Sequence, residues 1–162
     1  MFEVLVFVYE NYYAGDNCPE PEHLQRKLNA VGFESEEIDD ALIWLKGLNT
    51  AARGSHGFVG ATPPEPWLRE PSPTSIRIYP AAEQNHLGPQ CLGFISFLET
   101  AGVLPAPMRE VVIDRAMATP GSPVSLDDLK VIILMVYWSF GQEPDALVLD
   151  ELCEDASDRV AH

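Results

Sequence analysis

Basic residues are scarce in this chain. Its 162 residues include ten Lys+Arg against 25 Asp+Glu, which gives a formal net charge of −15 at pH 7 and a sequence pI near 4.4. A strongly acidic surface repels the phosphate backbone of nucleic acids. A protein whose main role is to clamp DNA or RNA is therefore disfavoured, and we expect no duplex DNA binding at physiological salt.

Cysteines are few and widely spaced. The chain has three and no C-x-x-C pair, which argues against a disulfide framework. Cys18 and His23 lie five residues apart and the other candidate ligands are scattered, whereas structural zinc sites take closely spaced pairs from two segments. We therefore predict no metal and no other cofactor. Cys91 falls on an apolar helical face, which is typical of a small buried thiol.

Signatures of membrane insertion and of catalysis are also missing. The longest apolar run, 131–138, is far shorter than the ~20 residues of a membrane span, and Glu3 and Glu10 stand where a secretory signal would carry basic residues. No G-x-S-x-G, glycine-rich phosphate loop or H-E-x-x-H occurs. Ser55 and His56 fall in a Gly-rich stretch expected to be a loop, where a catalytic base is poorly held. These observations predict a cytoplasmic protein that is not an enzyme.

Apolar residues recur at helical spacing through the first part of the chain, which predicts a mainly α protein with an N-terminal helical unit over 1–49. The expected helices cover 2–14, 21–31 and 36–47. The β-branched residues of 4–9 leave a strand open as an alternative there. The third helix is expected to be capped by Ser35 and to end at Gly47.

The second and third of these helices, joined by a tight turn at Gly32, have the spacing of a helix-turn-helix. Such a motif presents the N-terminal end of its second helix to the bases, between the phosphates. Here that end carries four carboxylates, those of Glu36, Glu37, Asp39 and Asp40. Major-groove recognition by this helix is therefore disfavoured. A plain three-helix bundle and a protein-binding domain of the ubiquitin-associated type stay open as alternatives.

Proline and glycine concentrate after residue 49. Segment 50–73 is too rich in both to sustain a helix, which predicts a Pro/Gly-rich linker over 50–80. Within the linker, 58–59 and 75–79 have the pattern of short strands. A hairpin of these two pieces would resemble the wing of a winged helix.

Residues 81–162 are expected to form a C-terminal helical bundle. The expected helices cover 81–101, 106–118, 126–140 and 145–155. Gly88-Pro89 should kink the first of them, and Ser125 should cap the third together with Asp128. The third helix is apolar nearly all round, so we expect the other three to enclose it in a monomer; cover by a second copy of the chain is the alternative.

Taken together, several short motifs of the sequence resemble those of the Smg family, a small bacterial family of unknown function. The resemblance covers nearly the whole chain and is specific as a set: Gly32-Phe33-Glu34, Ala41-Leu42-Ile43-Trp44-Leu45, Arg77-Ile78-Tyr79, Cys91-Leu92-Gly93-Phe94, Arg109-Glu110-Val111-Val112-Ile113-Asp114-Arg115 and Leu126-Asp127-Asp128-Leu129-Lys130. The chain departs from the family in the long segment 50–73 and in its C-terminal tail. The resemblance implies no activity and no catalytic residue. Genes of the family often lie beside genes for DNA processing, which is association rather than mechanism.

A non-catalytic interaction protein, an adaptor, is the leading functional interpretation. Arg109, Arg115 and Lys130 are the main bases of the second half and the candidates for docking an unknown protein partner, although local ion pairing is the favoured explanation for them. The alternative is an accessory factor in DNA processing that contacts DNA weakly through the winged N-terminal unit. Its candidate contacts are Arg26, Lys27, Lys46, Arg53, Arg69 and Arg77.

Overall fold

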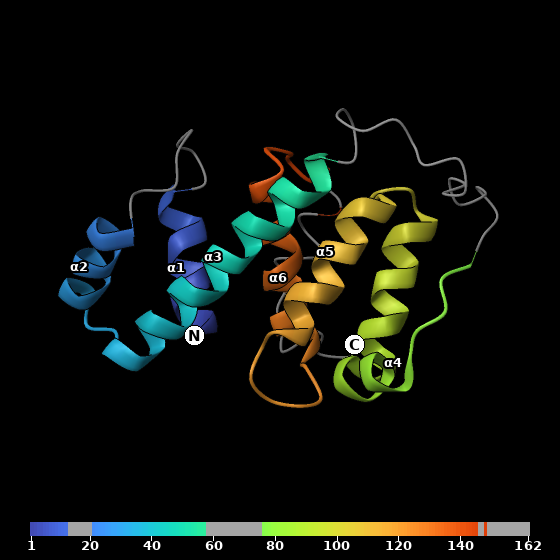
Figure 1. Cartoon of the computed structure of the whole chain (residues 1–162), viewed down its shortest axis with the longest axis horizontal. Coiled ribbons are helices and arrows are strands. Elements are labelled where there is room, and N and C mark those ends of the chain that lie inside the picture. Colours follow the sequence, from blue (N-terminus) through green and yellow to red (C-terminus); the bar gives the residue numbers. More distant parts are fainter. Residues whose placement is uncertain (13–20, 58–75, 146–147, 149–162) are drawn as a thin grey trace, which may run out of the picture.

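The computed structural model describes residues 1–12, 21–57, 76–145 and 148. Within these residues the chain forms helices and no strand, which confirms the mainly α prediction and removes the strand alternative for 4–9 (Figure 1). The helices are α1 (Phe2–Tyr12), α2 (Pro21–Val31), α3 (Ser35–Gly57), α4 (Ala81–Thr100), α5 (Ala106–Met117) and α6 (Leu126–Ser139). None of these helices is both long and apolar enough to cross a membrane.

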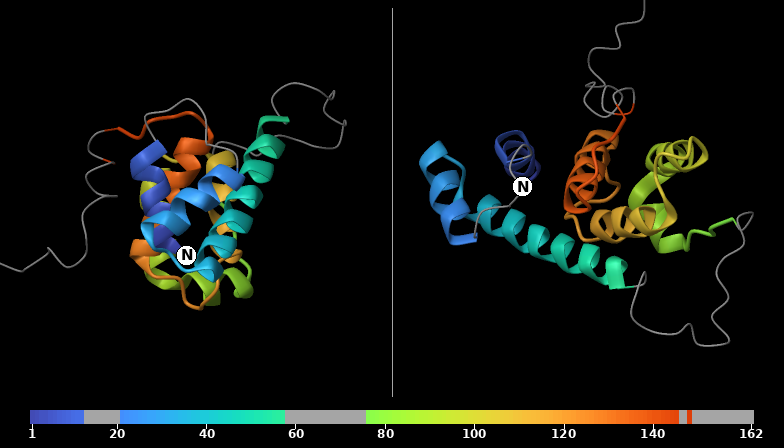
Figure 2. Two further views of the ribbon diagram at one scale, coloured as in Figure 1. Left: turned by 90° about the vertical axis from the view of Figure 1, so that its left-hand side faces the viewer. Right: turned by 90° about the horizontal axis from the view of Figure 1, so that it is seen from above.

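Helix α6 lies at the centre of the molecule, where it packs against α1, α3, α4 and α5 (Figures 1 and 2). Leu129 and the consecutive side chains from Ile132 to Tyr137 are buried. Helices of the same chain therefore enclose α6, as predicted. The predicted enclosure did not include α1 or α3, and the helix expected at 145–155 lies almost wholly outside the described residues.

Helix α3 runs along one side of the molecule, from α2 past α1 to α5 (Figure 2). The prediction that it ends at Gly47 is wrong, because it continues to Gly57 and includes Ser55 and His56. Gly47 does not stop the helix; it lies where the Arg115 side chain of α5 crosses α3, and a Cβ at this position would overlap the guanidinium. This glycine therefore serves close packing rather than chain reversal.

Residues 76–80 run along the protein without forming a strand, so the strand predicted over 75–79 is wrong for the residues described. The side chains of this segment nevertheless alternate between partly buried and exposed positions. Arg77 and Tyr79 are partly buried, whereas Ile76 and Ile78 are 90% and 87% exposed. Ion pairs of Arg77, described below, place the charged side chain inward. The other predicted strand, 58–59, lies outside the described residues.

The predicted ends of the helices are right in part. The Ser125 Oγ accepts a hydrogen bond from the Asp128 amide at 3.1 Å and so caps α6, as predicted. Ser35, in contrast, is the first residue of α3 rather than its cap. Gly88 kinks α4 as predicted, since its φ of 71° is a left-handed conformation that glycine adopts at little cost.

One cluster of buried apolar residues runs through both of the predicted helical units. Helices α1 and α3 contact α6, and α3 also contacts α5. The Trp44 Nε1 of α3 donates a hydrogen bond to the Arg115 carbonyl oxygen of α5 at 3.0 Å. The division into units 1–49 and 81–162 stays a prediction, because shared packing does not define how each part folds alone.

Candidate functional site

The two arginines named as docking candidates, for which local ion pairing is the favoured explanation, lie on α5 and are largely covered. Arg109 forms ion pairs with Glu99, at the end of α4, and with Glu110. Arg115 forms an ion pair with Asp114 at 2.6 Å. The side chains of Arg109 and Arg115 are only 12% and 14% exposed. The structure therefore places both arginines in local ion pairs.

Lys130, the third predicted docking residue, belongs to the core rather than to the surface. It is 4% exposed on α6, and its Nζ lies 5.9 Å from the centre of the Phe94 ring. Arg109 pairs with an acid of α4, and Arg115 crosses α3 at Gly47. The structure thus places the three predicted residues in three different surroundings and does not bring them together.

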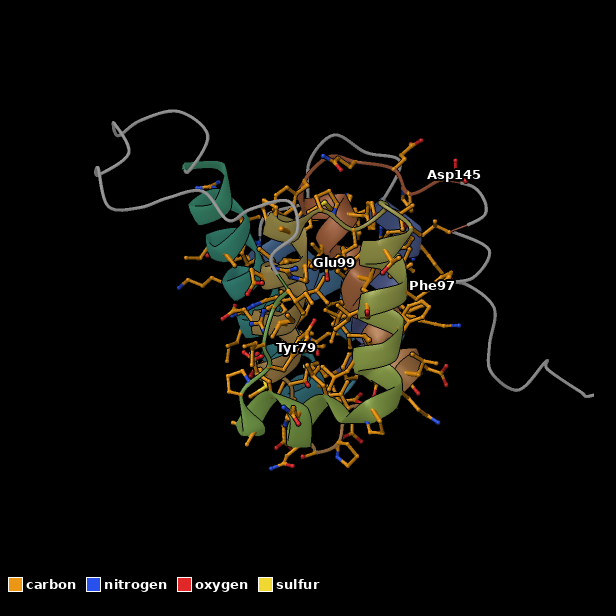
Figure 3. The ribbon with its side chains drawn as sticks, turned by 90° about the vertical axis from the view of Figure 1, so that its right-hand side faces the viewer. Tyr79, Phe97, Glu99 and Asp145 are labelled. Atoms are coloured by element: carbon orange, nitrogen blue, oxygen red, sulfur yellow. The ribbon has the colours of Figure 1, made fainter. Side chains whose placement is uncertain are left out.

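Arg77 is the centre of the densest ion-pair network in the described residues. Its guanidinium contacts the Glu83 carboxylate at 2.6 and 3.1 Å and the Glu110 carboxylate at 2.8 and 3.0 Å. It also lies 4.5 Å over the centre of the Tyr79 ring. Figure 3 looks onto this side of the molecule, with Tyr79 and Glu99 between the extended segment and α4. The network fastens residues 76–80 to α4 and α5.

The network changes the acidity of its members. Hydrogen bonds from Arg77 to Glu83 and Glu110 raise the pKa of the guanidinium further above neutrality. Partial burial acts to raise the pKa of Glu110, but hydrogen bonds from Arg77 and Arg109 outweigh it and the pKa is lowered. Burial raises the pKa of Tyr79. All these shifts favour the charge states already present at neutral pH, which suits a structural clasp rather than a proton-transfer site.

The bases proposed for DNA contact do not form one surface. Arg26 and Lys27 are exposed on α2, and the Lys27 Nζ lies 4.9 Å from the centre of the Tyr12 ring. Lys46 and Arg53 are exposed on the second half of α3, which runs away from α2 (Figure 1). Arg77 is held by two carboxylates, as described above, and residue 69 lies outside the described residues.

Cys91 is a buried thiol, as predicted. Its Sγ donates to the Val124 carbonyl oxygen at 3.3 Å and lies 3.6 Å from the Ser125 carbonyl oxygen. Burial raises the pKa of the thiol to about 11, so it is protonated at neutral pH and is neither a nucleophile nor a ready metal ligand. In the part of the chain that the structure describes, no three His, Cys, Asp or Glu side chains are grouped to hold a metal ion.

A groove that the sequence analysis did not assign lies between α3 and the end of α5. It consists of two adjoining hollows that share Ile43 and Arg115. Ile43 is 71% exposed. One hollow also contains Lys46 and Asp114, and the other Asp40. We call this surface the α3–α5 groove.

The sequence does carry a signal for this groove. The buried face of α3 includes Ile38, Ala41, Trp44 and Leu48, which recur at helical spacing. Ile43 is apolar but lies off this stripe, so an amphipathic α3 necessarily turns it toward solvent. A large aliphatic residue outside the core-facing stripe of a helix is the feature that could have indicated the site.

Comparison with known proteins identifies relatives along the entire chain. The family model described as "Protein of unknown function (DUF494)" matches residues 1–162. A protein named "Protein Smg homolog" from Methylibium petroleiphilum is 56% identical over 162 residues, with both chains covered completely. The relative of the same name from Bordetella pertussis is 49% identical over 162 residues, again with complete coverage of both chains. No solved structure matches the chain.

Proposed function

This chain belongs to the Smg family, a family of unknown function, and from its own surface we propose that it is a non-catalytic adaptor that binds a partner protein in the α3–α5 groove. The observation that carries the proposal is the 71% exposure of Ile43 within that groove. Fully burying a large aliphatic side chain is worth roughly 1.5–3 kcal/mol. A partner that covers Ile43 would gain part of this free energy.

The walls of the groove support this proposal because they are preformed. The Trp44 indole and the Arg115 carbonyl oxygen join α3 to α5, and Arg115 is held in turn by Asp114. A partner would therefore bind without ordering these elements first, which lowers the entropic cost of association. Ile76 and Ile78 are more exposed than Ile43, but they adjoin residues 58–75, outside the described residues, so their exposure supports no docking site.

Weak contact with duplex DNA is the second candidate, and it has less support. The bases that would make the contact are divided between α2 and the second half of α3, and Arg77 is neutralised by two glutamates. The exposed acids Glu36, Asp39 and Asp40 lie at the end of α3 that a helix-turn-helix would present to DNA.

Site-specific photo-crosslinking in the native cell tests the adaptor proposal. A photoreactive aromatic amino acid is placed at Ile43, and a matched control carries it at Asn49, which is exposed on the same helix but does not line the groove. We expect a discrete crosslinked protein from position 43 and none from position 49. The crosslink should disappear when the untagged wild-type chain is supplied in excess, because it competes for the partner.

A second variant guards against misfolding as the explanation. Ile43→Asp should abolish co-purification of the crosslinked protein while leaving the urea midpoint of the chain unchanged, since Ile43 is exposed. Equal crosslinking from positions 43 and 49, or none from either, would contradict the proposed function.

A further inference from the structure

Two charges flank Ile43 on the exposed face of α3. Asp40 precedes Ile43 by three residues and Lys46 follows it by three, so the three side chains form one ridge that runs obliquely along the helix, with the two charges about 120° apart around its axis. Neither Asp40 nor Lys46 takes part in an ion pair within the described residues. The α3–α5 groove therefore carries a negative charge at one end, a positive charge at the other and an apolar centre.

The other charges around the groove are already matched. Arg115 on the facing wall forms an ion pair with Asp114. The amino terminus of Met1, which lines the same hollow as Asp40, forms an ion pair with Glu37 at 3.4 Å. Asp40 and Lys46 are thus the charges left for a bound partner to complement.

The spacing of the ridge fits a helical partner better than an extended one. Three residues of helix advance about 4.5 Å, so Ile43 lies about 4.5 Å along the axis from each charged residue. Side chains on one face of a partner helix recur at the same interval, at i, i+3 or i+4, and i+7. On one face of a strand they recur about every 6.6–6.8 Å. An extended segment that placed its apolar side chain on Ile43 would therefore match the spacing of the two charges less closely than a helix does.

The helix dipole favours one direction for the partner. An acid near the N-terminal end of a helix and a base near its C-terminal end are favourable within that helix. A partner with this order places its acid opposite Lys46 and its base opposite Asp40 only when it runs antiparallel to α3. The opposite direction would require the unfavourable order of charges within the partner.

We propose that the partner segment is an amphipathic helix that packs antiparallel to α3, with an acid opposite Lys46, an aliphatic side chain on Ile43 and a base opposite Asp40, a proposal that rests on the proposed function. From its N-terminus the segment has the pattern acid-x-x-aliphatic-x-x-x-base. The groove discriminates by the order of the charges and not by their number, since both orders have the same net charge.

Two model peptides test this order directly. Each is an alanine-based helix of about 15 residues held helical by a side-chain bridge. One carries Glu-x-x-Leu-x-x-x-Lys, and the other has Glu and Lys exchanged. Affinity for the full chain is measured by fluorescence anisotropy at low salt, where exposed ion pairs are least screened. We expect the Glu-first peptide to bind at least about fivefold more tightly than the Lys-first peptide.

Variants of the chain separate the charge order from general attraction to an acidic protein. The double variant Asp40→Lys/Lys46→Asp keeps the net charge and should reverse the preference, so that the Lys-first peptide binds more tightly. Ile43→Asp should weaken both peptides at least about tenfold, because the apolar centre is lost. The matched control Asp39→Lys/Arg53→Asp exchanges an acid and a base of α3 that do not line the groove, and it should keep the preference for the Glu-first peptide.

The outcomes distinguish this inference from the proposed function. Equal binding of the two peptides, no binding of either, or a preference that the Asp40/Lys46 exchange does not reverse would overturn the antiparallel helix. If position 43 still crosslinks a protein in the cell, the adaptor function stands without it. Self-association of the chain that Ile43→Asp abolishes would also overturn the inference, because a second copy would then occupy the groove.

Discussion

Helices α6 and α3 use apolar residues in opposite ways. Helix α6 is apolar nearly all round, and four helices of the same chain enclose it. Helix α3 has a single buried stripe, and its exposed face carries Ile43 between Asp40 and Lys46, two charges that form no ion pair in the part of the chain that the structure describes. The comparison teaches that apolar residues all round a helix predict its place in the core, whereas one aliphatic residue off the stripe of an amphipathic helix is left exposed, and here it lies in the groove that we propose as a docking site.

The largest expected effect is a difference in stability between two variants, each of which replaces one isoleucine of α6 or α3 by alanine. Ile132 of α6 is fully buried, so Ile132→Ala should lower the free energy of unfolding by about 2–5 kcal/mol. Ile43→Ala in α3 should change it by less than about 0.5 kcal/mol. Urea unfolding of both variants, at two protein concentrations, checks the difference. An unchanged midpoint for Ile132→Ala would show that α6 is not the core element, and a midpoint that rises with concentration in the wild type would show that a second subunit contributes to the core.

The next largest expected difference in stability is between the alanine variants of two serines at the starts of α6 and α3. The Ser125 Oγ accepts the Asp128 amide hydrogen at the start of α6, so Ser125→Ala should destabilise the protein by about 1 kcal/mol. Ser35 begins α3 without acting as its cap, and Ser35→Ala should have little effect. Thermal unfolding of the two variants measures the contrast. A loss of equal size at Ser35 would mean that its hydroxyl caps α3 after all.

The sequence predicts α6 well because local and long-range signals agree there. The capping serine, the acids of the first turn and the apolar run all indicate a buried helix beginning near Leu126. At the end of α3 the signals conflict. Glycine is typical of helix ends, so Gly47 predicts a stop. Its role depends instead on Arg115, which is distant in the sequence and reaches Gly47 only in the folded protein. Helix propensity, which depends on local sequence, cannot predict such a long-range contact.

The candidate site was less predictable than the fold for a related reason. Charge draws attention to Arg109, Arg115 and Lys130 as docking candidates, although local ion pairing is the favoured explanation for them. Arg109 and Arg115 are covered in ion pairs, because bases in an acidic helical bundle find carboxylates nearby, and Lys130 is buried on α6. Ile43 has no unusual chemistry, and only its orientation on α3 distinguishes it.

Two glycines test the crossing of α3 and α5. Gly93 is exposed in α4 with open space around it, so Gly93→Ala should stabilise the protein by roughly 0.5–1 kcal/mol through helix propensity. Gly47→Ala should gain less or lose stability, because the new methyl group displaces the Arg115 guanidinium. Chemical unfolding compares the two, and the double variant Gly47→Ala/Arg115→Ala should recover part of the gain. Equal gains at both positions would mean that the crossing imposes no constraint.

Acidification should have a smaller effect on stability, through Glu110 of α5, which belongs to the Arg77 network. The pKa of Glu110 is lowered in the folded protein, so its ionised form stabilises the fold above the ordinary glutamate pKa of about 4.3, and this contribution is lost as pH falls below that value. Glu110→Gln should therefore show a weaker loss of stability than the wild type as pH falls below about 4.3. Urea unfolding across this range checks the prediction. Parallel pH profiles would show that the network does not depend on this charge.

The smallest expected effect is that the protein does not bind duplex DNA. The prediction depends on the charges at the two ends of α3. A fluorescent DNA duplex titrated with the protein at ~0.15 M salt, where the Debye length is ~8 Å, should show no complex. The net charge of −15 and the exposed acids Glu36, Asp39 and Asp40 repel phosphates near the start of α3. Lys46 and Arg53, farther along the helix, are too few to reverse this repulsion, so Lys46→Glu and Arg53→Glu should change nothing. Sub-micromolar binding that these two substitutions abolish would replace the adaptor with a DNA-contacting accessory, and α3 would then be a nucleic-acid surface along its second half.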